Sequence, residues 1–310
     1  MIQKSNLRGD MGQFAEANGI KIWHETFGNK ENPTILLIMG ACAQGILWPK
    51  AFCEKLANEG HYVIRYDHRD AGLSTCFNWA ENPYDLKDMA NDAVGLLNAL
   101  GVKRAHLFGV SLGAYLAELM AIDHPEKVDT ITLMGAARDI RPMNRALAGL
   151  PRSEGIAFSS PTSAYLAWMK EFMKLTPQNE KEQLAHRLEG WNQLNGFKIP
   201  LNDEMNRKVH LEFLSRLTYP QGMANHMAVL ASKSAEEWVQ KIPSRIKVPT
   251  AILQGSEDPI VRPDHGEALH HDIPHSEYFL VEGMGHVPND HFFDFYIDVL
   301  KKQVSKATAK

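Results

Sequence analysis

Long apolar runs and a large charge of one sign are absent from this sequence. No apolar run approaches the ~18 residues of a membrane-spanning helix, and residues 1–14 lack the apolar core of a secretory signal, so we expect neither segment. The net charge over 310 residues is −4, with both signs interspersed. That balance argues against nucleic acid or an anionic membrane as a partner.

Cysteine is also scarce. Cys42, Cys53 and Cys76 are odd in number and show no C-x-x-C spacing, so free thiols in a reducing cytoplasm are the simplest account. The sequence has no phosphate-binding loop, no dinucleotide fingerprint and no metal-ligand spacing. We therefore expect no cofactor, no metal and a small molecule as the substrate.

Apolar runs of strand length alternate with helix-like stretches. The expected strands are residues 34–39, 61–66, 105–110, 128–134, 249–254 and 277–281, after a hairpin within residues 12–27. The expected helices are residues 49–58, 85–100, 235–241, 262–271 and 290–304, with a further helix that starts at Ala114. This alternation predicts an α/β fold, a mostly parallel sheet with helices on both faces.

The alternation stops between residues 138 and 232, where helical stretches are punctuated by glycine and proline. We therefore predict a core domain of residues 1–137 and 233–310, with a helical cap, or lid, of residues 138–232 as an insertion. Some apolar residues of the insertion must face the crevice beneath it, because a lid excludes water there. The insertion has 12 Lys/Arg and 9 Asp/Glu, and this small excess of positive charge does not require an anionic substrate.

A G-x-S-x-G motif, Gly109-Val110-Ser111-Leu112-Gly113, joins an expected strand directly to an expected helix. Such a turn is sharp, and glycine at its two ends removes side chains that would collide. Ser111 is thereby raised above the helix N-terminus, with the backbone N–H of Leu112 beside it. The context predicts a nucleophile elbow with Ser111 as the nucleophile.

A serine nucleophile needs a histidine base that is oriented by a carboxylate, and both should follow the elbow on loops after later strands. Glu257, Asp258 and Asp264 compete for the role of the acid. Asp264 is expected on the following helix, and Asp258 precedes a proline that favours an extended loop position. We therefore choose Asp258.

His286 is the predicted base, because Gly283 and Gly285 allow the backbone to bring its imidazole into a tight site. Most of the 14 histidines must be ordinary surface residues. Those on or just after an expected helix look solvated: His265, His270, His271 and His275.

An oxyanion hole needs two backbone N–H donors aimed at the developing negative charge. One is expected from Leu112, and the other from Ala41 in the loop after the first parallel strand. Cys42 beside it is expected to be a small buried residue. In the polar loop of residues 67–74, the charged side chains Asp67, Arg69 and Asp70 are expected to cross-link loops beneath the site by charge-assisted hydrogen bonds.

The elbow, the order Ser111, Asp258, His286 and the loop at Gly40 resemble the α/β-hydrolase fold family. The segments LLIMG, YVIRYDHRDAGLST and EGMGH are similar to bacterial esterases of the aclacinomycin methylesterase type. The resemblance covers residues 20–135 and 233–300, and the insertion more loosely. It implies a serine carboxylesterase with a helical lid over an apolar pocket, and it implies the same triad and oxyanion donors.

Two residues depart from that family pattern. Ala41 stands where those methylesterases tend to have glycine, which keeps the N–H but adds a methyl group expected to narrow the acyl side. Leu112 stands where methionine is more usual, with little expected effect.

Hydrolysis of a carboxylic ester through an acyl-enzyme is the leading prediction. Thioester hydrolysis, C–C bond hydrolysis and perhydrolysis would use the same triad. A dehalogenase or an epoxide hydrolase would need aspartate in place of Ser111. The non-enzymatic alternative is a ligand receptor that retains the triad, and turnover of p-nitrophenyl esters would separate it from an enzyme.

Overall fold

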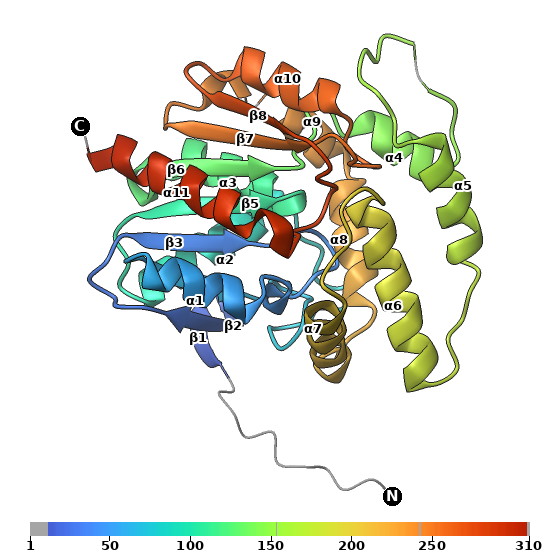
Figure 1. Cartoon of the computed structure of the whole chain (residues 1–310), viewed down its shortest axis with the longest axis horizontal. Helices are drawn as coiled ribbons and strands as arrows, with labels where there is room; N and C mark the ends of the chain where they lie inside the picture. The colour runs from blue at the N-terminus through green and yellow to red at the C-terminus, as the bar shows by residue number, and fades with distance from the viewer. Residues whose placement is uncertain (1–11, 153, 242, 309–310) are drawn as a thin grey trace, which may run out of the picture.

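The computed structural model describes residues 12–152, 154–241 and 243–308, so the expectation of no secretory signal falls largely outside it. The described strands form one sheet in the order β1-β2-β4-β3-β5-β6-β7-β8 (Figure 1). β2 pairs antiparallel with β1 and with β4, and the other neighbours pair in parallel. The expected α/β fold with a mostly parallel sheet is confirmed.

The strands lie close to their predicted positions. They are β1 Gln13–Ala17, β2 Ile20–Phe27, β3 Thr34–Ile38, β4 Tyr62–Tyr66, β5 Ala105–Val110, β6 Val128–Met134, β7 Thr250–Gly255 and β8 Glu277–Val281. Asn18 and Gly19 have φ angles of 51° and 76°, so both residues of the first turn take the left-handed conformation that a two-residue hairpin favours.

Helices cover the sheet on both faces (Figure 1). One face carries α1 Lys50–Asn58 and α11 Phe293–Thr308, and the other carries α2 Leu86–Ala99, α3 Leu112–Asp123, α9 Lys233–Lys241 and α10 Pro263–Asp272. Alternate residues of β3 contribute to the two cores: Ile35 and Leu37 face α1 and α11, and Leu36 and Ile38 face the other side. A parallel sheet needs this double cover.

Residues 138–232, the helical insertion, lie between β6 and α9. They hold α4 Arg141–Leu147, α5 Ser163–Phe172, α6 Glu180–Asn195, α7 Asp203–Ser215 and α8 Gly222–Leu230. In Figure 1 these helices stand beyond the arrowheads of the central strands, at the carboxyl edge of the sheet. In the part of the chain that the structure describes, no helix is long and apolar enough to cross a membrane.

Candidate active site

Ser111 occupies a strained turn between β5 and α3. Its φ of 54° and ψ of −117° are unusual for a residue with a side chain. A Cβ on Gly109 would lie 2.2 Å from the Gly113 carbonyl oxygen, and a Cβ on Gly113 would lie 2.2 Å from that of Ile38, so both glycines are required. Ser111 keeps accessible surface, whereas Val110 and Leu112 on either side are buried.

Asp258 and His286 meet on the loops after β7 and β8. The Nδ1 atom of His286 lies 2.7 Å from Oδ2 of Asp258. The other carboxylate oxygen accepts the backbone N–H groups of Ile260 and Val261 at 2.9 and 2.8 Å. Asp258 has no exposed surface, and His286 is 6% exposed. Because the carboxylate is held at both oxygens, it fixes Nδ1 of the imidazole as the protonated nitrogen and leaves Nε2 as the basic one.

The carboxyl end of β6 brings this pair to the side of Ser111. The N–H of Ser111 donates to the carbonyl oxygen of Met134 at 2.9 Å. The next residue, Gly135, has a φ of 58°, and a Cβ there would lie 3.0 Å from Nδ1 of His286 and 3.3 Å from Oδ2 of Asp258. Ser111 and the pair therefore both lie against the Met134-Gly135 dipeptide.

The other candidate acids lie elsewhere. Oδ2 of Asp264 accepts the N–H of Ser159 at 2.8 Å. Glu257 is partly exposed and packs against Gly196. The expectation that His265 is solvated is wrong: it is 2% exposed, and its Nε2 lies 2.9 Å from the carbonyl oxygen of Ser159. The segment around residues 158–159 covers this part of α10, which the sequence pattern predicts to face solvent.

The loop after β3 also approaches Ser111. A Cβ on Gly40, the residue before Ala41, would lie 3.4 Å from Cβ of Ser111. Cys42 has a φ of 60°, a left-handed conformation that needs support. Burial raises the pKa of the Cys42 thiol to about 11, which keeps it neutral.

His226 of α8 supplies that support, and nothing in the sequence singled it out. Its Nδ1 accepts the N–H of Cys42 at 3.0 Å, and its Nε2 lies 2.7 Å from the carbonyl oxygen of Arg69. Burial lowers the pKa of His226, so the imidazole is neutral and uses one nitrogen as acceptor and the other as donor. The helical insertion thus holds the loop that carries Ala41.

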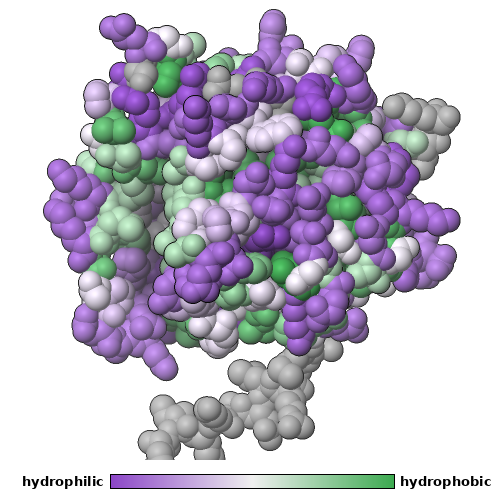
Figure 2. Space-filling view, turned by 180° about the vertical axis from the view of Figure 1, so that it is seen from behind, coloured by the Kyte–Doolittle hydropathy of each residue, from purple (hydrophilic) through white to green (hydrophobic). Residues whose placement is uncertain are grey.

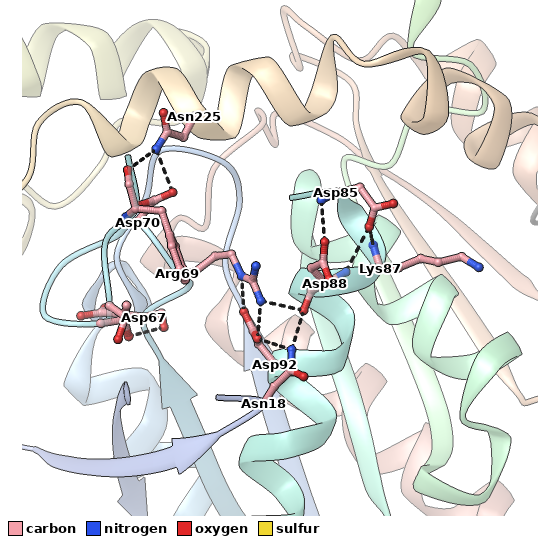
Figure 3. Close-up of polar contacts among 12 residues, drawn as sticks. Asn18, Asp67, Arg69, Asp70, Asp85, Lys87, Asp88, Asp92 and Asn225 are labelled. Carbon is pink, nitrogen blue, oxygen red and sulfur yellow. Dashed lines mark hydrogen bonds and ion pairs between the residues drawn. The ribbon is translucent and has the colours of Figure 1, made fainter. Parts of the chain in front are cut away.

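A polar network fastens the same loops from below (Figure 3). Arg69 of the loop of residues 67–74 binds both carboxylate oxygens of Asp92 on α2, at 2.6 and 2.7 Å. Asp70 accepts a hydrogen bond from Asn225 of α8 at 2.9 Å, and Asp67 accepts one from Arg216 at 2.6 Å. The predicted cross-linking role of Asp67, Arg69 and Asp70 is confirmed.

The carboxyl end of α6 contacts the histidine loop. The backbone N–H of His286 donates to the carbonyl oxygen of Leu194 at 2.8 Å. Asn289 donates to Oδ1 of Asn195 at 2.9 Å, and Asn195 donates to the carbonyl oxygen of Ile199 at 2.8 Å. The insertion and the loop after β8 therefore form one hydrogen-bonded junction.

Two surfaces of the insertion are hollowed. A cavity of about 390 Å³ lies between α7 and the sheet, beside Trp23, Arg65 and Arg216, and Ser111 and His286 do not line it. Seen from behind, the side of the molecule that carries the insertion shows a furrow with hydrophobic side chains along one wall (Figure 2).

Comparison with known proteins identifies the family of this chain and the reactions of similar proteins. Residues 33–291 match a family described as alpha/beta hydrolase fold. Rhodomycin D methylesterase of Streptomyces peucetius is 34% identical over 274 residues, which cover 86% of this chain and 89% of that protein. 3-Oxoadipate enol-lactonase 2 of Acinetobacter baylyi is 23% identical over 275 residues, which cover 88% of this chain and 89% of that protein. An esterase structure from Exiguobacterium antarcticum shares the fold, with a TM-score of 0.71 at 20% identity over 96% of this chain and 100% of that one.

Proposed function

The chain belongs to the alpha/beta hydrolase fold family and is a carboxylic ester hydrolase, and from that premise we propose that it forms an acyl-enzyme on Ser111. The observation that carries the proposal is the hydrogen bond of 2.7 Å between His286 and Asp258, beside an elbow serine that keeps accessible surface. A neutral imidazole with its proton fixed on Nδ1 is the base that a serine hydroxyl requires.

In the proposed acylation step, Oγ of Ser111 attacks the ester carbonyl carbon while Nε2 of His286 takes the hydroxyl proton. The tetrahedral intermediate then expels the alcohol, which leaves with that proton. Water attacks the acyl-enzyme in the same way, and the acid product leaves Ser111 free. Asp258 orients the imidazole and stabilises its charged form between the two proton transfers.

We assign the oxyanion hole to the backbone N–H groups of Ala41 and Leu112. Leu112 begins α3, where N–H groups are unpaired and the helix dipole favours negative charge. The N–H of Ala41 has no acceptor among the described residues, and Ala41 keeps accessible surface beside Ser111. The hydrogen bond between Cys42 and His226 supports the loop conformation that this assignment needs.

We assign residues 138–232 the role of a lid over the site, on a core of residues 1–137 and 233–310. The contact between Leu194 and His286 and the contact between His226 and Cys42 support this role, because both join the insertion to loops around Ser111. A cytoplasmic location is proposed from the cysteines, since Cys42, Cys53 and Cys76 are all free.

Steady-state hydrolysis of p-nitrophenyl butyrate and of methyl esters tests the proposed nucleophile. Ser111→Ala should lower kcat by about 10⁴-fold or more with an unchanged Tm, because only the attacking atom is lost. Ser215→Ala, at an exposed serine of α7, is the matched control and should retain full activity. An active, folded Ser111→Ala protein would overturn the assignment. Thioesters and diketones in the same assay separate the alternative reactions.

A further inference from the structure

Arg187, in the middle of α6, is a partly buried cation without an anion among the described residues. Its Nε is buried and has no hydrogen-bond partner, and no carboxylate of the described chain pairs with it. The buried arginines do have one. Arg65 binds Glu25 and Arg69 binds Asp92. The buried Nε of Arg187 therefore has neither an acceptor nor a carboxylate beside it, and removing such a group from water costs free energy.

The neighbours of Arg187 are aromatic or neutral. Its guanidinium lies 3.8 Å from the ring centroid of Phe213 and 5.9 Å from that of Trp191. Ring faces attract the charge but accept none of its N–H groups in the plane of the guanidinium. His210 nearby has neither ring nitrogen hydrogen-bonded in the described chain. Burial lowers the pKa of Arg187 to about 10, so the side chain remains charged at neutral pH.

Arg187 lies on a face of α6 that reaches the loops beside Ser111. Residues 187, 191 and 194 are spaced four and three apart, so they share one face of α6. At one end of that face the Leu194 carbonyl holds the His286 backbone. At the other end, Arg187 is close enough to Cys42 to lower the pKa of its thiol against the larger effect of burial. Cys42 follows Ala41, and both keep accessible surface.

We propose that Arg187 binds a carboxylate carried by the ester substrate, at a second point of the site. This inference rests on the proposed ester hydrolysis and adds the substrate class, an ester with an anionic group remote from the scissile bond. The helical rise separates residues 187 and 194 by roughly 10 Å along α6, so the anion and the reacting carbonyl should be several bonds apart. A planar guanidinium favours a carboxylate because it can donate two parallel hydrogen bonds.

The test compares p-nitrophenyl monoesters of adipic and suberic acid with the same esters whose free carboxyl is methylated. Wild type should favour the carboxylate esters. Arg187→Met should lower kcat/KM for them by about 10–100-fold, mainly through KM, and change the methylated esters by less than about threefold. Arg207→Met, at an exposed arginine of the insertion, is the control and should leave both series unchanged.

Two results would overturn the proposal. One is a wild type that does not favour the carboxylate esters, and the other is an Arg187→Met protein that loses both series equally, as a merely structural stack on Phe213 predicts. If Arg187→Met does not fold, adipate should still inhibit wild-type hydrolysis of a neutral ester competitively, and Arg187→Lys should weaken that inhibition. Absence of inhibition would count against the proposal. Failure of the proposed function differs from all of these, because Ser111→Ala would then still hydrolyse the neutral ester.

Discussion

The parallel strands and the inserted helices bury their residues to very different extents. β3, β4, β5 and β7 are buried along their whole length. By contrast, α6 buries only Leu184 and Asn195, and the insertion leaves Met173 and Phe197 73% and 77% exposed. Close packing fixes the atoms at the strand ends, whereas helices with few buried contacts can shift at low cost. The proposed function assigns the reaction to the strand ends and selection of the substrate to the insertion.

The largest expected effect lies at the end of β7. Asp258→Asn should lower kcat by about 10⁴-fold for every ester, because an amide favours the wrong imidazole tautomer while it preserves the shape of the site. Kinetics with p-nitrophenyl butyrate measure it, and Glu257→Gln is the matched control, with a change below about threefold. If the control loses more activity than Asp258→Asn, the acid of the triad is Glu257 and not Asp258.

His226 lies in the insertion, but His226→Ala should impair the reaction itself. Without His226, the Cys42 N–H loses its acceptor and the loop that carries Ala41 loses its support. We expect kcat to fall by about 10–100-fold, by the same factor for short and long acyl chains, as for a weakened oxyanion hole. His186→Ala, on α6, should leave kcat unchanged. A loss that varies with acyl length would instead place His226 in substrate selection.

The smallest effect on activity is expected behind the elbow, at Glu118 of α3. Burial raises the pKa of Glu118 from 4.5 to about 8, so the folded protein holds this proton more tightly than the unfolded chain does. The resulting stabilisation is fully present below about pH 4.5 and is lost as the pH rises through about 8. Glu118→Gln should therefore be more stable than wild type in alkali.

Thermal unfolding of both proteins at pH 5 and pH 8.5 measures this difference. The Tm advantage of Glu118→Gln should grow by about 5 °C between the two pH values, with kcat unchanged. Glu126→Gln, at an exposed glutamate, should show no such trend. An advantage that stays constant with pH would mean that Glu118 does not titrate in this range.

Local signals explain which features could be predicted from sequence. The glycines around Ser111 and His286 and the proline after Asp258 act on the backbone within a few residues. The elbow and the choice of a loop acid can therefore be predicted from neighbouring residues in the sequence. The strands follow from their apolar runs in the same way. His226 could not be predicted, because its partner at Cys42 is 184 residues away and is a backbone atom.

Arg187 and His265 escaped prediction for a related reason. The net charge of the insertion gives every arginine the same weight. In the structure, however, Arg216 pairs with the carboxylate of Asp67, whereas Nε of Arg187 has no partner. His265 lies on a helix whose cover comes from residue 159, more than a hundred positions earlier. Burial of a polar side chain by a distant segment leaves no periodic pattern in the sequence.

In the proposed lid role, the hydrogen bond between Leu194 and His286 limits how α6 can move. If α6 moved away as a rigid rod, it would pull on the backbone of the proposed base or break that bond. A motion that leaves the imidazole in place must instead pivot about the carboxyl end of α6, so that its amino end travels furthest and Arg187, at its middle, moves less. In the proposed lid role, α6 would then open at its amino end, while the hinge stays beside the proposed base.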